Sequence, residues 1–294
     1  MPETLIDSDL LKRLEQLALA SRRFSAGRMK GERRSRRRGE GMDFADHRNY
    51  TPGDDLRALD WKIYGRLERL FIKRFLEEED LKVHILIDAS QSMSFGEPSK
   101  LLYAKRIAAA LGHICLARMD SLSACAFGDG LLARFGPRRG KGHSPAWLDF
   151  LTRLEMSSGT TSLVRSFEAF ARMTGPRGLV VVLSDFYDFE GYEEAFRRLF
   201  ARDFEVLALH ILSPEELRPD LEGDLRLQDA EFRQTADVSM GRGALASYGR
   251  ALSAFTSGLG KHIIGRGGYY LLTSTELPFD RLVLDVLRRK GVLR

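Results

Sequence analysis

Short apolar runs alternate with longer stretches of helical spacing from about residue 80 to the C-terminus. The short runs predict strands at 82–87, 122–127, 131–135, 178–184, 204–211 and 268–272. The longer stretches predict helices at 99–119, 144–155, 162–173, 190–200, 242–264 and 279–290. Alternating strands and helices are typical of a mostly parallel sheet with helices on both faces. The fold class predicted for this region is therefore α/β.

Three further stretches lie outside this alternation. Residues 8–20 carry leucines at helical spacing, which predicts an amphipathic packing helix. Residues 70–75 alternate in part and predict a strand, and residues 225–239 alternate around a polar centre, which predicts an inserted hairpin. We expect a small N-terminal segment over residues 1–79 that docks, through charged pairs and the strand at 70–75, on an α/β domain over residues 80–294.

The segment from Gly41 to Trp61 combines a turn signal with dense charge. Pro52 and Gly53 suit the central positions of a type II turn, and Asp54 is expected to cap a short helix after it. We interpret the alternating charges as an ion-paired network that ties the segment to the main domain. The alternative is a partner-binding surface, for which the candidate residues are Asp54, Arg57, Asp60 and Trp61.

The composition is that of an ordinary globular chain of 294 residues, with 44% hydrophobic and 30% charged residues. The two cysteines, Cys115 and Cys125, fall in a predicted helix and a predicted strand, so we expect buried reduced thiols rather than a disulfide. No apolar stretch approaches the ~18–20 residues that a membrane span needs. The N-terminus has no secretory pattern, because charged residues interrupt its leucines. We therefore expect a cytoplasmic protein without a membrane span.

The net charge of +5 is unevenly distributed, because residues 22–38 contain nine Lys or Arg and a single acid, Glu32. Such a run could bind nucleic acid or an anionic membrane surface. Alternatively, it is a solvated loop or a strip that meets an acidic partner. The absence of aromatic residues between Ser25 and Glu40 argues against stacking on single-stranded nucleic acid.

Candidate chemistry follows the strands predicted at 82–87 and 178–184. The first strand is followed by Asp88, Ser90 and Ser92, and the second by Asp185. Between them lies the hydroxyl-rich stretch 157–163, which contains Thr160 and Thr161. The carboxyl edge of a parallel sheet is where open α/β folds place their ligands. Carboxylate and hydroxyl oxygens are ligands for Mg²⁺, although the same residue types also cap helices.

These three segments together resemble the metal-ion-dependent adhesion site of von Willebrand factor A domains. By position, the resemblance assigns the metal ligands Asp88, Ser90, Ser92, Thr161 and Asp185, with Thr160 as the alternative threonine. The segment Gly39–Trp61 is similar to the signature of the DUF58 family, in which G-x-G, F, R-x-Y-x-P-G-D-D, R and D-W follow in order. That family carries von Willebrand A-like domains, and its members are commonly encoded beside MoxR-type AAA+ ATPases.

The resemblance implies a non-enzymatic protein-interaction adaptor that binds Mg²⁺ or Mn²⁺. Its expected partners are a MoxR-type AAA+ ATPase, in chaperone-like maturation or assembly of other proteins, and a client protein that supplies a carboxylate to the metal. Nucleic-acid binding through residues 22–38 is the alternative function. A Mg²⁺-dependent phosphohydrolase is a weaker one, because position 90 is Ser where aspartate-based phosphotransferases have a second Asp as acid and base.

Overall fold

A computed structural model describes residues 5–19, 43–76, 81–157, 161–175, 177–188, 190–220, 223–228 and 235–293. The chain divides into a larger unit, formed by Met1–Ala20 with Leu81–Arg294, and a smaller unit, Ser21–Asp80. The first 20 residues therefore belong with the α/β unit. From the sequence we instead expect residues 1–79 in one N-terminal segment and residues 80–294 in the α/β domain.

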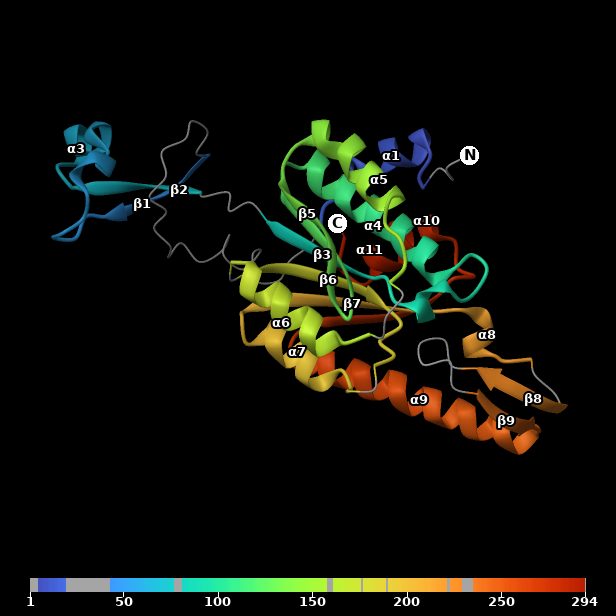
Figure 1. The fold of residues 1–294 in the computed structure, drawn as a ribbon. Helices are drawn as coiled ribbons and strands as arrows, with labels where there is room; N and C mark the ends of the chain where they lie inside the picture. Colours follow the sequence, from blue (N-terminus) through green and yellow to red (C-terminus); the bar gives the residue numbers. More distant parts are fainter. Residues whose placement is uncertain are drawn as a thin grey trace. The chain divides into compact units, whose positions relative to one another are not determined.

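The larger unit contains a six-stranded sheet with the order β10-β7-β6-β3-β4-β5 (Figure 1). Neighbours from β10 to β4 pair in parallel, whereas β5 runs antiparallel to β4. The strands are β3 (Lys82–Asp88), β4 (Ser121–Gly128), β5 (Gly130–Arg138), β6 (Gly178–Ser184), β7 (Phe204–Leu212) and β10 (Tyr269–Ser274). The predicted α/β class, its mostly parallel sheet and the positions of these strands are confirmed.

Helices cover both faces of this sheet (Figure 1). On one face lie α4 (Lys100–Ala117), α5 (Ser144–Thr152) and α1 (Ser8–Leu14). On the other face lie α6 (Leu163–Met173), α7 (Glu193–Phe200) and α9 (Arg242–Ile264). The helix predicted over 279–290 is interrupted, because the π-helical turn Leu282–Val286 separates α10 (Phe279–Arg281) from α11 (Leu287–Arg289).

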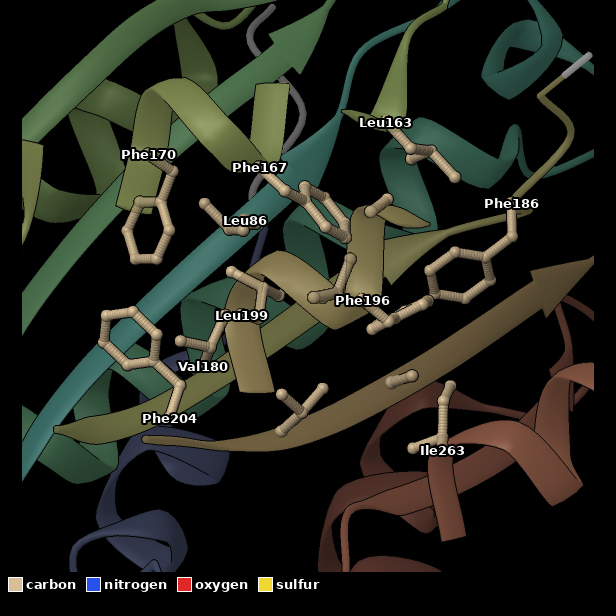
Figure 2. Packing of buried hydrophobic residues seen from close by; sticks show 14 of the residues in the cluster. Leu86, Leu163, Phe167, Phe170, Val180, Phe186, Phe196, Leu199, Phe204 and Ile263 are labelled. Atoms are coloured by element: carbon tan, nitrogen blue, oxygen red, sulfur yellow. The ribbon is translucent and has the colours of Figure 1, made fainter. Parts of the chain in front are cut away.

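A large apolar cluster lies between the sheet and helices α6, α7 and α9 (Figure 2). Successive strand residues point to opposite faces, so Leu86 and Val180 reach this cluster from β3 and β6. Phe167 of α6 and Phe196 of α7 meet edge to face, with ring centroids 5.5 Å apart. Burying each such side chain contributes roughly 1.5–3 kcal/mol, which ties the helices to the strands and keeps the strand ends in place.

The N-terminal helix α1 packs on α4, which explains why it belongs to the larger unit. Asp7 begins the helix by accepting a hydrogen bond from the Leu10 N–H, with 2.6 Å between Oδ1 and N. Leu14 is fully buried, and Leu19 forms an isolated antiparallel bridge with Leu293. The amphipathic packing helix predicted for this stretch is present, although it ends at Leu14 rather than at residue 20.

The smaller unit contains a hairpin of β1 (Asp43–Asn49) and β2 (Phe71–Leu76), with α3 (Trp61–Leu67) in the connection. Strand β1 was not predicted, because its charged sequence has no apolar alternation and only pairing with β2 makes it a strand. The predicted turn is confirmed, since Gly53 has a φ of +102° and the Asp54 N–H donates to the Thr51 carbonyl at 3.0 Å.

The prediction that Asp54 caps a helix is wrong. Its carboxylate instead accepts from the Thr51 N–H at 2.9 Å and from the Arg48 guanidinium at 2.8 Å. The Thr51 N–H and then Arg48 lower the pKa of Asp54 to about 2. The caps are its neighbours: Asp55 begins the 3-10 helix Leu56–Ala58, and Asp60 begins α3. Asp54 therefore stabilises the turn, and the residue beside it takes the capping position.

The predicted inserted hairpin is confirmed as β8 (Gly223–Gln228) paired antiparallel with β9 (Thr235–Met240), between α8 (Pro214–Leu217) and α9. Both cysteines are free and buried, as predicted. Within the described part of the chain, no helix combines the length and the apolar character that crossing a membrane requires.

We expect Gly112→Ala to lower the free energy of unfolding by about 1–3 kcal/mol, because a Cβ at Gly112 in α4 would overlap the indole of Trp147 in α5. Gly249→Ala in α9 is the matched control, since a Cβ there meets nothing within 4 Å. It should leave stability unchanged or raise it by up to about 1 kcal/mol. Urea unfolding monitored by circular dichroism measures both, and equal effects would contradict the packing described.

Stability should decrease as pH falls from about 6.5 to about 4, because burial and then the charge of Lys82 lower the pKa of His84 to about 4. Within this window the unfolded chain binds a proton that folded His84 does not, so stability rises with pH. His84→Gln should reduce the slope by up to about 1.4 kcal/mol per pH unit. Ser123→Ala removes the hydroxyl 2.6 Å from His84 Nδ1 but keeps the imidazole, and should retain the slope in urea unfolding at several pH values.

Candidate functional site

Two carboxylates meet where the neighbouring strands β3 and β6 end. Asp88 is the last residue of β3, and Asp185 directly follows β6. The strands pair in parallel with Ile87 opposite Leu183, so the two aspartates lie at the same edge of the sheet. Both side chains are fully buried. The sequence prediction that these strand ends converge is thus reproduced by the sheet order.

Two serines contact Asp88, and a third contacts one of them. The Ser184 hydroxyl donates to Asp88 Oδ2 at 2.5 Å, and the Ser90 N–H donates to Asp88 Oδ1 at 2.9 Å. The hydroxyls of Ser90 and Ser92 lie 3.0 Å apart. Ser90 is fully buried, whereas Ser92 is half-buried, so solvent approaches the cluster from the side of Ser92. Sequence reasoning did not assign a role to Ser184, although the residue immediately precedes Asp185.

The electrostatics of this cluster favour a cation. Burial, and next the negative charge of Asp185, raise the pKa of Asp88 to about 7. Hydrogen bonds from Ser184 and Ser90 act in the opposite direction but do not cancel these effects. A cation placed near the two carboxylates would favour their ionised forms and relieve their mutual repulsion.

Lys100, the first residue of α4, supplies one positive charge to this site. Its Nζ lies 2.8 Å from Asp185 Oδ2 and 2.5 Å from Glu216 Oε1, and the lysine is fully buried. Burial disfavours the ammonium, but the charges of Asp185 and Glu216 outweigh it and raise the pKa of Lys100. Sequence reasoning missed both Lys100 and Glu216, because they lie 85 and 31 residues from Asp185 and only the fold brings them together.

Glu216 is held in place by the short helix α8. Its carboxylate accepts from the Ser213 N–H at 2.8 Å, while the Ser213 hydroxyl accepts from the Glu216 N–H at 3.2 Å. The Tyr248 hydroxyl of α9 donates to the Glu216 carbonyl at 2.7 Å. The segment that carries the inserted hairpin is therefore linked to the carboxylate pair through Glu216 and Lys100.

Thr161 lies in the loop that reaches this edge of the sheet from α5. The Ser157 N–H donates to the carbonyl of Ala89 at 2.6 Å, and the Ser162 N–H donates to the carbonyl of Gly128, at the end of β4, at 3.0 Å. Thr161, which is buried, immediately precedes Ser162, the N-cap of α6. The loop thus brings Thr161 to the edge where β3 and β4 end. The alternative threonine, Thr160, lies outside the described residues.

These donors fit a hard divalent cation. Asp88 and Asp185 offer carboxylate oxygens, and Ser90, Ser92 and Thr161 offer neutral hydroxyls, which is the chemistry that Mg²⁺ or Mn²⁺ accepts. No group of three or more His, Cys, Asp or Glu placed to hold a metal occurs in the ranges that the structure describes. A metal here would therefore depend on the serine and threonine hydroxyls, with Lys100 as a neighbouring positive charge.

The candidate partner-binding residues lie in the smaller unit and have different surroundings. Asp54 takes part in the turn network with Arg48, and Asp60 caps α3 and lies 3.0 Å from His47 Nε2. Arg57 is exposed, and Trp61 is 64% exposed. The two aspartates therefore shape this unit, whereas Arg57 and Trp61 are presented to solvent.

Comparison with known proteins identifies the family. A family model described as "Protein of unknown function DUF58" matches residues 46–252. An uncharacterized protein of Mycobacterium tuberculosis is 26% identical over 294 residues, which cover 98% of this chain and 92% of that protein.

Two solved structures from Bacteroides are also similar to this chain, each at 15% sequence identity. An aerotolerance-related membrane protein from Bacteroides fragilis aligns over 72% of this chain and 98% of its own, with a TM-score of 0.46. The conserved hypothetical protein BatB from Bacteroides thetaiotaomicron aligns over 71% and 98%, with a TM-score of 0.45. Likenesses of this strength carry no argument about what this chain binds.

Lys100→Met should lower the free energy of unfolding by about 3–5 kcal/mol in metal-free buffer, because Asp185 and Glu216 lose their buried counter-charge. The double variant Lys100→Met/Asp185→Asn should lose roughly 0.5–3 kcal/mol less free energy of unfolding than the sum of the losses in the two single variants. Lys141→Met, at a surface lysine paired with Glu15, is the matched control and should cost at most about 1 kcal/mol. Additive effects of Lys100→Met and Asp185→Asn in chemical denaturation would refute the coupling.

Proposed function

We propose that this chain, which belongs to the DUF58 family of proteins of unknown function, is a metal-dependent protein-interaction adaptor with a von Willebrand A-like domain. The observation that carries the proposal is the grouping of Asp88, Ser90, Ser92 and Asp185 at one edge of the sheet, with Thr161 in the loop that reaches it. In this proposal the chain is not an enzyme, and its site binds rather than turns over a ligand.

The charge of the donors supports a binding role. Asp88, Asp185 and the hydroxyls of Ser90, Ser92 and Thr161 would hold Mg²⁺ or Mn²⁺. Two carboxylates formally balance the charge of a divalent ion, but Lys100 already compensates part of the charge of Asp185, so the ion keeps part of its positive charge. A metal held in this way can accept a further oxygen ligand from outside. We infer that a carboxylate of a client protein completes the coordination from the half-buried side of Ser92.

The partner that we propose for this adaptor is a MoxR-type AAA+ ATPase, in chaperone-like maturation or assembly of other proteins. This part rests on the similarity of Gly39–Trp61 to the family signature and not on a contact in the structure. Nucleic-acid binding remains the second possibility, but the basic run 22–38 that motivates it lies outside the described residues. A phosphohydrolase has less support, because Ser90 stands where an acid–base aspartate would be needed.

The full chain should bind Mn²⁺ in a titration followed by electron paramagnetic resonance, and Asp88→Asn should weaken the affinity at least about ten-fold. The double variant Ser90→Ala/Ser92→Ala should do the same, because it removes two hydroxyl donors that lie 3.0 Å apart. Asp149→Asn is the matched control, since Asp149 is an exposed carboxylate of α5 paired with Arg153, and it should bind Mn²⁺ like the unaltered chain. An unaltered chain that binds no Mn²⁺ would refute the metal site.

The adaptor role is tested separately from metal binding, by a binding assay with the ATPase. The immobilised chain should retain a MoxR-type ATPase in Mg²⁺ and lose it in a chelator or with Asp88→Asn, while Asp149→Asn retains it. If the ATPase is retained equally in Mg²⁺ and in a chelator, and equally by Asp88→Asn, the proposed mechanism is contradicted, even if the chain binds Mn²⁺.

A further inference from the structure

Helix α3 in the smaller unit has an apolar side that faces solvent. Trp61, Tyr64 and Leu67 are 64%, 42% and 61% exposed, and none of the residues of α3 is buried. Their spacing of three residues places them on one side of the helix. The rings of Trp61 and Tyr64 meet edge to face, with centroids 6.1 Å apart, so they form one continuous surface. We call these three side chains the α3 apolar face.

The hairpin holds the start of α3, while the apolar side of the helix is exposed. Asp60 caps the helix, accepting from the Lys62 and Ile63 N–H groups at 2.9 and 3.3 Å, and its own N–H donates to the carbonyl of Phe71 in β2 at 2.9 Å. Leu59, just before the cap, is buried and bridges to Ile72. The sequence around α3 thus anchors the helix by its start and leaves the α3 apolar face outward.

Basic side chains surround this face. Lys62 and Arg66 lie on the other side of α3, and Arg57 and Arg69 flank the helix, all four exposed. Between residues 56 and 70 the acids are Asp60, which is buried in the cap, and Glu68. By sequence, the same unit also contains the run 22–38 with nine Lys or Arg. A helix with Trp and Leu on one side and Lys and Arg on the other is typical of segments that lie in a membrane interface.

We propose that α3 attaches this protein to the surface of an anionic lipid bilayer. The α3 apolar face enters the boundary between headgroups and acyl chains, while Lys62, Arg66 and the flanking arginines contact anionic headgroups. This is peripheral binding and requires no membrane span. It is independent of the proposed metal site, which lies in the other unit.

A bilayer suits this surface better than a protein partner does. A seven-residue helix is only ~10 Å long, and three side chains cannot supply the roughly 800 Å² that each partner buries in a standard protein interface. Interfacial binding needs only a few inserted apolar side chains together with electrostatic attraction, which each basic residue near the surface strengthens about five-fold.

Sedimentation of the full chain with lipid vesicles tests the proposal, and a chelator in the buffer keeps metal binding from contributing. The chain should bind vesicles of phosphatidylcholine mixed with phosphatidylglycerol and not vesicles of phosphatidylcholine alone. Leu67→Ser should weaken the binding about ten-fold, since it removes an inserted apolar side chain. Lys62→Gln/Arg66→Gln should weaken it roughly 25-fold, at about five-fold for each basic residue.

Matched variants in the larger unit serve as controls. Leu132→Ser changes a leucine that is 48% exposed, and Arg153→Gln/Arg172→Gln changes two exposed arginines, so both should bind like the unaltered chain. Tryptophan emission gives a second readout, because Trp147 is fully buried and Trp61 should shift to shorter wavelength on mixed vesicles. The proposal is overturned if the chain does not bind mixed vesicles at low salt, if the α3 variants bind like the controls, or if only an acidic protein is bound through these residues.

Discussion

The burial of Asp88 and Asp185 beside each other is the constraint on which the rest of the larger unit depends. Two carboxylates that share one buried site repel each other, so the fold must supply hydrogen bonds and positive charge there. Ser184 and Ser90 supply hydrogen bonds to Asp88, and Lys100 supplies the charge beside Asp185. The packing of α6 and α7 on the sheet keeps the two strand ends in register, and therefore keeps the carboxylates close enough to act together.

Lys100 also connects this edge of the sheet to the elements that flank the inserted hairpin. Through Glu216 it connects the carboxylate pair to α8, and the Tyr248 hydroxyl extends the connection to α9. The inserted hairpin lies between these two helices along the chain. Lys100 and Glu216 therefore connect the proposed metal site to the two helices that flank the insertion.

The smaller unit is stabilised largely by charged side chains. Its hairpin has few apolar residues, and charged groups therefore do much of the structural work: Arg48 and Asp54 close the turn, and Asp60 begins α3. While these charges are used internally, the apolar and basic side chains of α3 are among the described side chains of this unit that face solvent. Membrane attachment in one unit and metal-dependent recognition in the other would place a docking site at a bilayer surface.

Sequence alone determined the α/β class, the strand positions and the convergence of Asp88 with Asp185, because apolar runs of strand length end at those residues and parallel strands share an edge. It did not determine β1, whose charged residues become a strand only through pairing with β2. Nor did it reveal Lys100 and Glu216, since buried ion pairs between distant residues leave no local pattern. The periodicity of apolar residues in the sequence predicts which face of a helix or strand is buried. Which residue pairs with a buried charge depends on how the helices and strands pack in the tertiary structure.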